Sequence, residues 1–113
     1  GGIYTVDAFR RGAWGVMPGV AVVDRFVELY RSFAAGDLGA ARDVFENLMP
    51  LLWFEDQSLD FFIACEKQIL FDRGVIGSTH IRENGLTLNP FDVDELRALV
   101  GRLNAAPARV AAQ

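Results

Sequence analysis

The sequence is poor in the residues that most often carry chemistry. It has a single cysteine, Cys65, and a single histidine, His80, so it can form neither an internal disulfide nor a set of histidine ligands for zinc. The net charge is −4 and the arginines are scattered, which excludes the basic surface typical of nucleic-acid binding. We therefore expect no metal, no cofactor and no nucleic-acid partner.

Long hydrophobic runs are also missing. The apolar runs are far shorter than the roughly 20 residues that cross a membrane, and no signal peptide is recognisable. The unpaired cysteine fits a reducing compartment. We expect a cytoplasmic protein without a membrane contact.

The chain is nevertheless rich in apolar residues for its length. Of its 113 residues 51% are hydrophobic, and nine are phenylalanine. A chain of this length buries only about 60 to 70% of its unfolded surface, so part of the apolar surface is expected to face a partner or polypeptide outside this sequence. The chain starts Gly1-Gly2-Ile3 without a methionine. We expect it to be a processed product or a fragment.

Hydrophobic periodicity predicts a mainly α structure of four to five helices with one short strand. Residues 14–17 form a brief apolar run between Gly12 and Pro18-Gly19, which favours a buried strand. One strand cannot make a sheet, so its neighbours must come from elsewhere.

Amphipathic stripes predict the helices. They cover residues 6–11, 22–35, 38–54, 58–73 and 92–103. Asp37 is expected to cap one helix, Ser58 or Asp56 the next, and Asp92 the last, through a capping box with Glu95. Pro50 removes a backbone donor, so a kink or break is expected there.

Residues 10–19 read Arg-Arg-Gly-Ala-Trp-Gly-Val-Met-Pro-Gly. They resemble the helix end, the Gly-Ala-x-Gly turn and the eighth strand of the family of dihydrodipicolinate synthase and N-acetylneuraminate lyase. Later motifs follow in the family's order: Ala35-Gly36-Asp37 with Ala41, Leu48-Met49-Pro50-Leu51-Leu52, Phe54-Glu55-Asp56-Gln57 with Lys67 and Arg73-Gly74-Val75-Ile76, and Ile81-Arg82 with Leu88. The third set matches the variant found in sugar-acid aldolases and dehydratases. Glu83-Asn84 departs from the pattern, since many members have a proline after the arginine.

This resemblance implies a division of the chain. Residues 1–36 would be the end of a (β/α)8 TIM barrel (helix 7, strand 8 and helix 8), residues 37–104 a C-terminal helical extension, and residues 105–113 a flexible tail. In the family, a lysine on the sixth strand forms a Schiff base with pyruvate or a related 2-oxo acid, and a tyrosine on the fifth strand relays protons. Both would lie upstream of Gly1, so the resemblance implies no catalytic residue in this chain, which alone would be inactive.

The resemblance also implies a site and partners. Met17, Pro18 and Gly19 would line one side of the substrate pocket. The partners would be the remainder of the barrel, a small 2-oxo acid and further copies in a homo-oligomer. For Met17 an ordinary barrel-core role is an equal alternative, and for Pro18 and Gly19 turn formation is the simpler explanation.

Other candidate residues have structural interpretations. Lys67 is the only lysine, but a helical position beside Glu66 favours a structural or solvated role over Schiff-base chemistry. The acidic cluster of Glu55, Asp56 and Asp60 is expected to serve helix capping. Cys65 falls on an apolar helical face and is expected in the core.

A different class of function competes with the lyase. The clean amphipathic helices and the absence of catalytic residues also fit a stand-alone helical module for protein interaction or oligomerisation, without catalysis. A Schiff-base lysine in the sequence that precedes Gly1 would favour the lyase.

Overall fold

The computed structural model describes residues 2–82 and 86–106, and these residues fold into helices joined by short connections. The elements are α1 (Thr5–Arg10), the 3-10 helix η1 (Val20–Val22), α2 (Val23–Ala34), α3 (Leu38–Glu55), α4 (Leu59–Asp72) and α5 (Pro90–Ala105). The mainly helical class is therefore confirmed.

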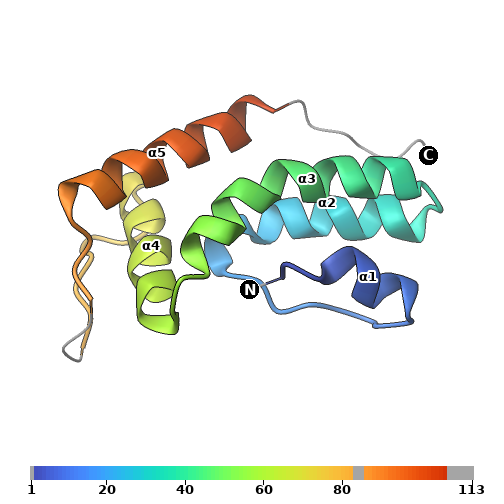
Figure 1. Ribbon diagram of the computed structural model, residues 1–113, viewed down its shortest axis with the longest axis horizontal. Helices are drawn as coiled ribbons and strands as arrows, with labels where there is room; N and C mark the ends of the chain where they lie inside the picture. Colours follow the sequence, from blue (N-terminus) through green and yellow to red (C-terminus); the bar gives the residue numbers. More distant parts are fainter. Residues whose placement is uncertain (1, 83–85, 107–113) are drawn as a thin grey trace.

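The centre of the molecule is an antiparallel pair of helices, α2 and α3. Helix α1 lies beside this pair at one end, whereas α4 crosses the other end and α5 lies against both α3 and α4 (Figure 1). Phe9 fixes α1 to α2, with its ring 5.7 Å from that of Tyr30 and 5.5 Å from that of Phe33. The fully buried core includes Val22, Phe26, Leu29, Leu48, Leu51, Leu52, Cys65 and Leu96.

Local sequence explains where several helices begin and end. The side chain of Asp37 accepts a hydrogen bond from the backbone N–H of Ala40 at 2.9 Å, and Ser58 accepts one from Phe61 at 3.0 Å. These are the predicted caps of α3 and α4. Gly36, with φ of +80°, follows α2, a backbone conformation that glycine adopts without strain.

The last helix begins earlier than predicted. Asn89, not Asp92, is the N-cap residue of α5, and the capping box joins Asn89 to Asp92. The physical reason is Pro90, because its fixed φ suits the first helical position and its missing N–H is not needed there. Helix α3 also runs through Pro50 without a break. The tail predicted for residues 105–113 lies mostly outside the described residues.

The strand predicted at residues 14–17 is absent from the part of the chain that the structure describes. Residues 13–19 form an irregular connection between α1 and η1, and Trp14 and Met17 are 96% and 95% exposed. A strand needs a partner for its backbone N–H and C=O groups. No second strand exists among residues 2–82 and 86–106, so this segment has nothing to pair with.

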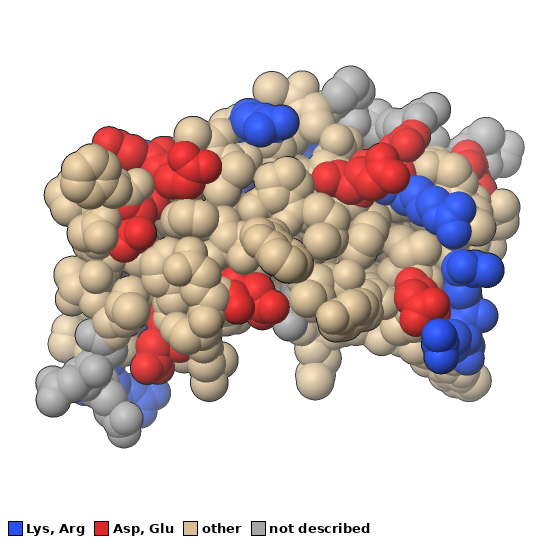
Figure 2. All heavy atoms as spheres, viewed as in Figure 1, with Lys and Arg blue, Asp and Glu red and all other residues tan. Residues whose placement is uncertain are grey.

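Charged groups of both signs are spread over the surface. Figure 2 shows acidic and basic atoms separated by broad uncharged areas, with most of the basic atoms on this face gathered at the end where α1 lies. Within the described residues, no helix combines the length and the apolarity that crossing a membrane requires.

Candidate functional site

The segment Met17, Pro18 and Gly19 leads from the exposed connection into η1. Pro18 lines an apolar groove together with Trp14, Val16 and residues of α2, whereas Met17 is not among the residues of that groove. Gly19 lies against α4, where a Cβ atom would overlap the side chains of Glu66 and Phe62. The three residues therefore have different surroundings in this chain, and a larger residue at position 19 would have to displace the side chains of Glu66 and Phe62.

Two side chains hold the backbone just after this segment, one from within α4 and one from the residue that follows its last turn. Glu66 Oε1 accepts a hydrogen bond from the N–H of Ala21 at 3.2 Å, and Arg73 Nη1 donates one to the carbonyl oxygen of Ala21 at 2.5 Å. We call these three residues the Ala21 clamp. Both polar groups of a fully buried residue are thereby satisfied, and the clamp fixes the position of residues 19–22 on α4.

Behind the clamp lies a second carboxyl group, Glu55, at the end of α3. Glu55 is 1% exposed and Glu66 6% exposed. No donor reaches either oxygen of Glu55 or Oε2 of Glu66 within the described residues. Burial, followed by the negative charge of Glu66, raises the pKa of Glu55 from 4.5 to about 9. A proton retained on Glu55 at neutral pH supplies the missing donor toward Glu66.

This arrangement suits positioning and not acid–base catalysis. A general acid or base must come within hydrogen-bond reach of a substrate atom, but both carboxyl groups are covered by η1, α3 and α4. Glu66 holds the backbone of Ala21 directly, and Glu55 interacts with Glu66 from behind. Glu66 thereby also holds the end of the predicted pocket segment, Met17 to Gly19.

The other candidate residues that were considered from the sequence have structural roles or positions. Lys67 Nζ donates to the carbonyl oxygen of His80 at 2.7 Å. Cys65 is fully buried, and burial followed by the charge of Glu55 raises the pKa of its thiol to about 12, so it is no thiolate at neutral pH. Asp60 lies in the first turn of α4, whereas Asp56 follows the last residue of α3. No group of three or more potential metal ligands occurs within residues 2–82 and 86–106.

The prediction that Glu55 lies at a helix start is wrong, because Glu55 is the last residue of α3, and no role was predicted for Glu66. A signal for Glu55 was present, because it lies three, four and seven residues after Leu52, Leu51 and Leu48, on the buried stripe of α3. An acidic residue on such a stripe indicates a buried polar group that needs a partner. Nothing in the sequence alone identified Glu66 as that partner, because the two lie on different helices.

Comparison with known proteins gives one informative match. No protein-family model and no curated protein matches the chain. Among solved structures, a crystal structure of dihydrodipicolinate synthase from Rhodopseudomonas palustris matches with a TM-score of 0.83 and 28% sequence identity. The match covers 89% of this chain and 33% of that protein, so the chain spans about a third of its length. The resemblance of this chain to dihydrodipicolinate synthase is thus confirmed by its structure.

Proposed function

We propose that this chain is the C-terminal part of a Schiff-base-forming lyase of the dihydrodipicolinate synthase type. The parent enzyme would act on pyruvate or a 2-oxo sugar acid, by aldol cleavage or condensation or by dehydration. The observation that carries the proposal is the structural match over 89% of the chain at 28% identity. The reactive lysine and the proton-relaying tyrosine would lie on polypeptide outside these 113 residues.

Within that enzyme, residues 14–17 would form the last strand of the barrel, and Met17, Pro18 and Gly19 would line one side of the substrate pocket. Ligand sites of such barrels form at the C-terminal ends of the strands, which is where these three residues would lie. The Ala21 clamp supports this role, because Glu66 and Arg73 fix the backbone that immediately follows. We propose Glu66 and Arg73 as positioning residues.

Reductive trapping tests the lyase. The intact protein that contains this chain is treated with pyruvate and borohydride, and the labelled lysine is located by peptide mass spectrometry. We expect a label on one lysine outside the 113 residues, and we expect the Lys67→Arg variant to be labelled equally. The hydrogen bond of Lys67 to His80 is the basis of the second expectation. A label on Lys67, or no label at all, would refute the proposed chemistry.

The pocket role of Met17 needs a separate measurement. In the intact enzyme, Met17→Ala should change the KM for the 2-oxo acid more than kcat, because an apolar lining residue contributes shape and contact and not proton transfer. Trp53→Ala, on the exposed surface of α3, is the matched control and should change neither constant. Equal kinetics for Met17→Ala and the unchanged protein would remove Met17 from the pocket.

One observation also favours the second candidate, a helical module for interaction or oligomerisation. Apolar side chains on α2 and on the connection before it are exposed, among them Trp14, Val23 and Tyr30. In the lyase this surface would face the rest of the barrel, and in a module it would face another protein. A protein that remains unlabelled by pyruvate and borohydride, but self-associates through this surface, would support the module.

A further inference from the structure

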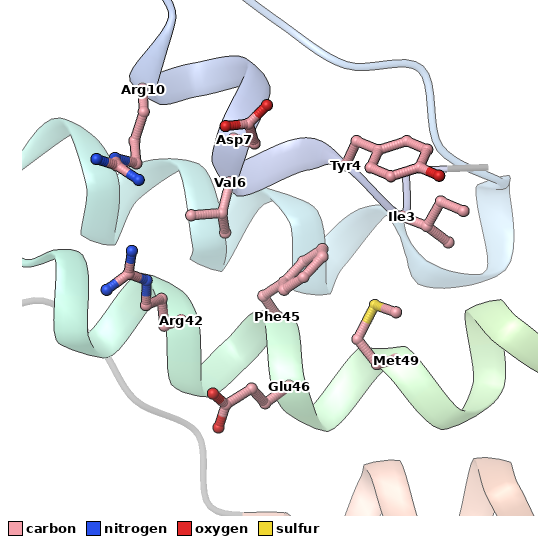
Figure 3. A pocket seen from close by; sticks show the side chains of 9 residues that line it. All are labelled: Ile3, Tyr4, Val6, Asp7, Arg10, Arg42, Phe45, Glu46 and Met49. Atoms are coloured by element: carbon pink, nitrogen blue, oxygen red, sulfur yellow. The ribbon is translucent and has the colours of Figure 1, made fainter.

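A cavity of about 340 Å³ lies between α1 and α3, apart from the Ala21 clamp. Figure 3 shows Val6 of α1 and Phe45 and Met49 of α3 directed into the space between the two helices, with Ile3 at one end. The volume falls within the range of small-molecule sites, roughly 300 to 1,000 Å³. The walls are mainly apolar, so an occupant of this cavity must present an apolar part to them.

The opposite end of the cavity is positively charged. Arg10 of α1 and Arg42 of α3 point toward each other across the gap (Figure 3). Neither guanidinium has an ion pair or hydrogen bond among the described residues. Two facing cations without an anion between them repel each other, and a ligand anion placed there would remove that repulsion.

The acidic residues at the cavity do not fill this role. Asp7, which also lines the cavity, forms an ion pair with Arg11 at 2.9 Å. The carboxylate of Glu46 points away from the two arginines, although Glu46 lies one turn after Arg42 (Figure 3). The charged end of the cavity therefore remains open to an anion from solution.

We propose that this cavity binds a small amphipathic carboxylate, an organic acid with one carboxylate and an apolar alkyl or aryl tail. The carboxylate would lie between Arg10 and Arg42, because planar guanidinium groups form paired hydrogen bonds with carboxylates. The tail would lie along Val6, Phe45 and Met49. Such a ligand would bridge α1 and α3 and stabilise their contact by binding only the folded chain. This inference does not depend on the proposed lyase activity.

The test is an NMR titration of the 113-residue protein, labelled with ¹⁵N, with four probes. Octanoate and 3-phenylpropanoate carry both the charge and a tail, octylammonium carries a tail with the opposite charge, and acetate carries the charge without a tail. We expect saturable amide shifts in residues 3–10 and 42–49 with the first two probes only. Binding of octanoate alone or of 3-phenylpropanoate alone would still support the site and define its tail.

Arginine variants test the charged end. Arg10→Gln and Arg42→Gln should each weaken binding about tenfold, as expected from the loss of a hydrogen bond between charged groups. Arg42→Lys should lose less, since it retains the charge but not the planar fork, and Arg102→Gln on the exposed surface of α5 should lose nothing. Circular dichroism checks that each variant keeps its helix content.

Four results would overturn the proposal. The first is that octylammonium causes shifts equal to those of octanoate, and the second is that the octanoate shifts centre on Trp14 and Val23 and not on the cavity. The third is that the Arg10→Gln/Arg42→Gln double variant binds with unchanged affinity. The fourth is that neither amphipathic carboxylate shows saturable binding.

Discussion

The two parts of this chain secure their helices in different ways. Helices α3, α4 and α5 each begin at a side-chain cap, supplied by Asp37, Ser58 and Asn89. Helices α1, η1 and α2 begin without any side-chain cap. Capping is local, because donor and acceptor lie within one turn. The helices after residue 36 are therefore specified by their own sequence, whereas those before it depend more on what packs against them.

The two sides of α2 show the same contrast. Phe26 and Leu29 are buried against the rest of the molecule, whereas Val23, Val27 and Tyr30 of the same helix are 42 to 47% exposed. A helix that is apolar on two sides is suited to lie between two layers, and only one layer is supplied by the described residues. This favours the proposed division, in which residues 1–36 end a barrel and residues 37–104 form an extension.

The largest expected effect on the free energy of unfolding distinguishes the buried side of α2 from its exposed side. Leu29→Ala should lower the free energy of unfolding by about 2 to 5 kcal/mol, because it leaves a cavity at a fully buried position. Val27→Ala should change it by no more than about 0.5 kcal/mol, because Val27 is 42% exposed. Urea unfolding of the 113-residue protein measures both. Equal losses would mean that the outer side of α2 is already packed, and the comparison would fail.

A second effect, smaller for each unit of pH, is expected from the buried carboxyl pair at the contact between the two parts. The folded protein keeps a proton on Glu55 up to about pH 9, whereas the unfolded chain releases it near pH 4.5. The folded state therefore binds more protons between these values, so stability falls as pH rises through this window, by at most about 1.4 kcal/mol per pH unit. Below and above the window this group contributes no slope.

Glu55→Gln should remove that slope, because glutamine has the shape of the protonated acid and does not titrate. Unfolding free energies measured from pH 5 to pH 9 test this, with the exposed neighbour changed in Asp56→Asn as the control. If Glu55→Gln and the unchanged protein show the same pH dependence, Glu55 does not hold the proton.

The sequence predicted those features that depend on neighbouring residues. The helices, the caps at Asp37 and Ser58, and the glycine after α2 follow from periodicity and turn chemistry within a few positions. The start of α5 was misplaced because two capping patterns overlap, and Pro90 decides between them. A proline at the first helical position is a local signal, and it favours Asn89 over Asp92 as the N-cap residue.

Contacts between residues that lie far apart in the chain could not be predicted from the sequence. The Ala21 clamp connects positions 45 and 52 residues apart, and the Glu55–Glu66 pair connects two helices. The strand at 14–17 failed for the opposite reason, since its pattern was apolar and short but its pairing partner is not among the described residues. A hydrophobic pattern predicts a buried segment and does not show which polypeptide buries it.

The smallest effect tests local capping, on which the comparison of the two parts depends. Asp37→Ala should cost about 1 kcal/mol, because the N–H of Ala40 loses its acceptor at the start of α3. Asp37→Asn should restore most of this loss, since asparagine also caps. Asp24→Ala, in the first turn of the uncapped α2, should cost less, because only an interaction with the helix dipole is lost. Thermal unfolding of the three variants measures these differences. Equal losses of stability at positions 24 and 37 would show that charge near a helix start, and not the cap, stabilises both helices. The two parts of the chain would then not differ in how their helices begin.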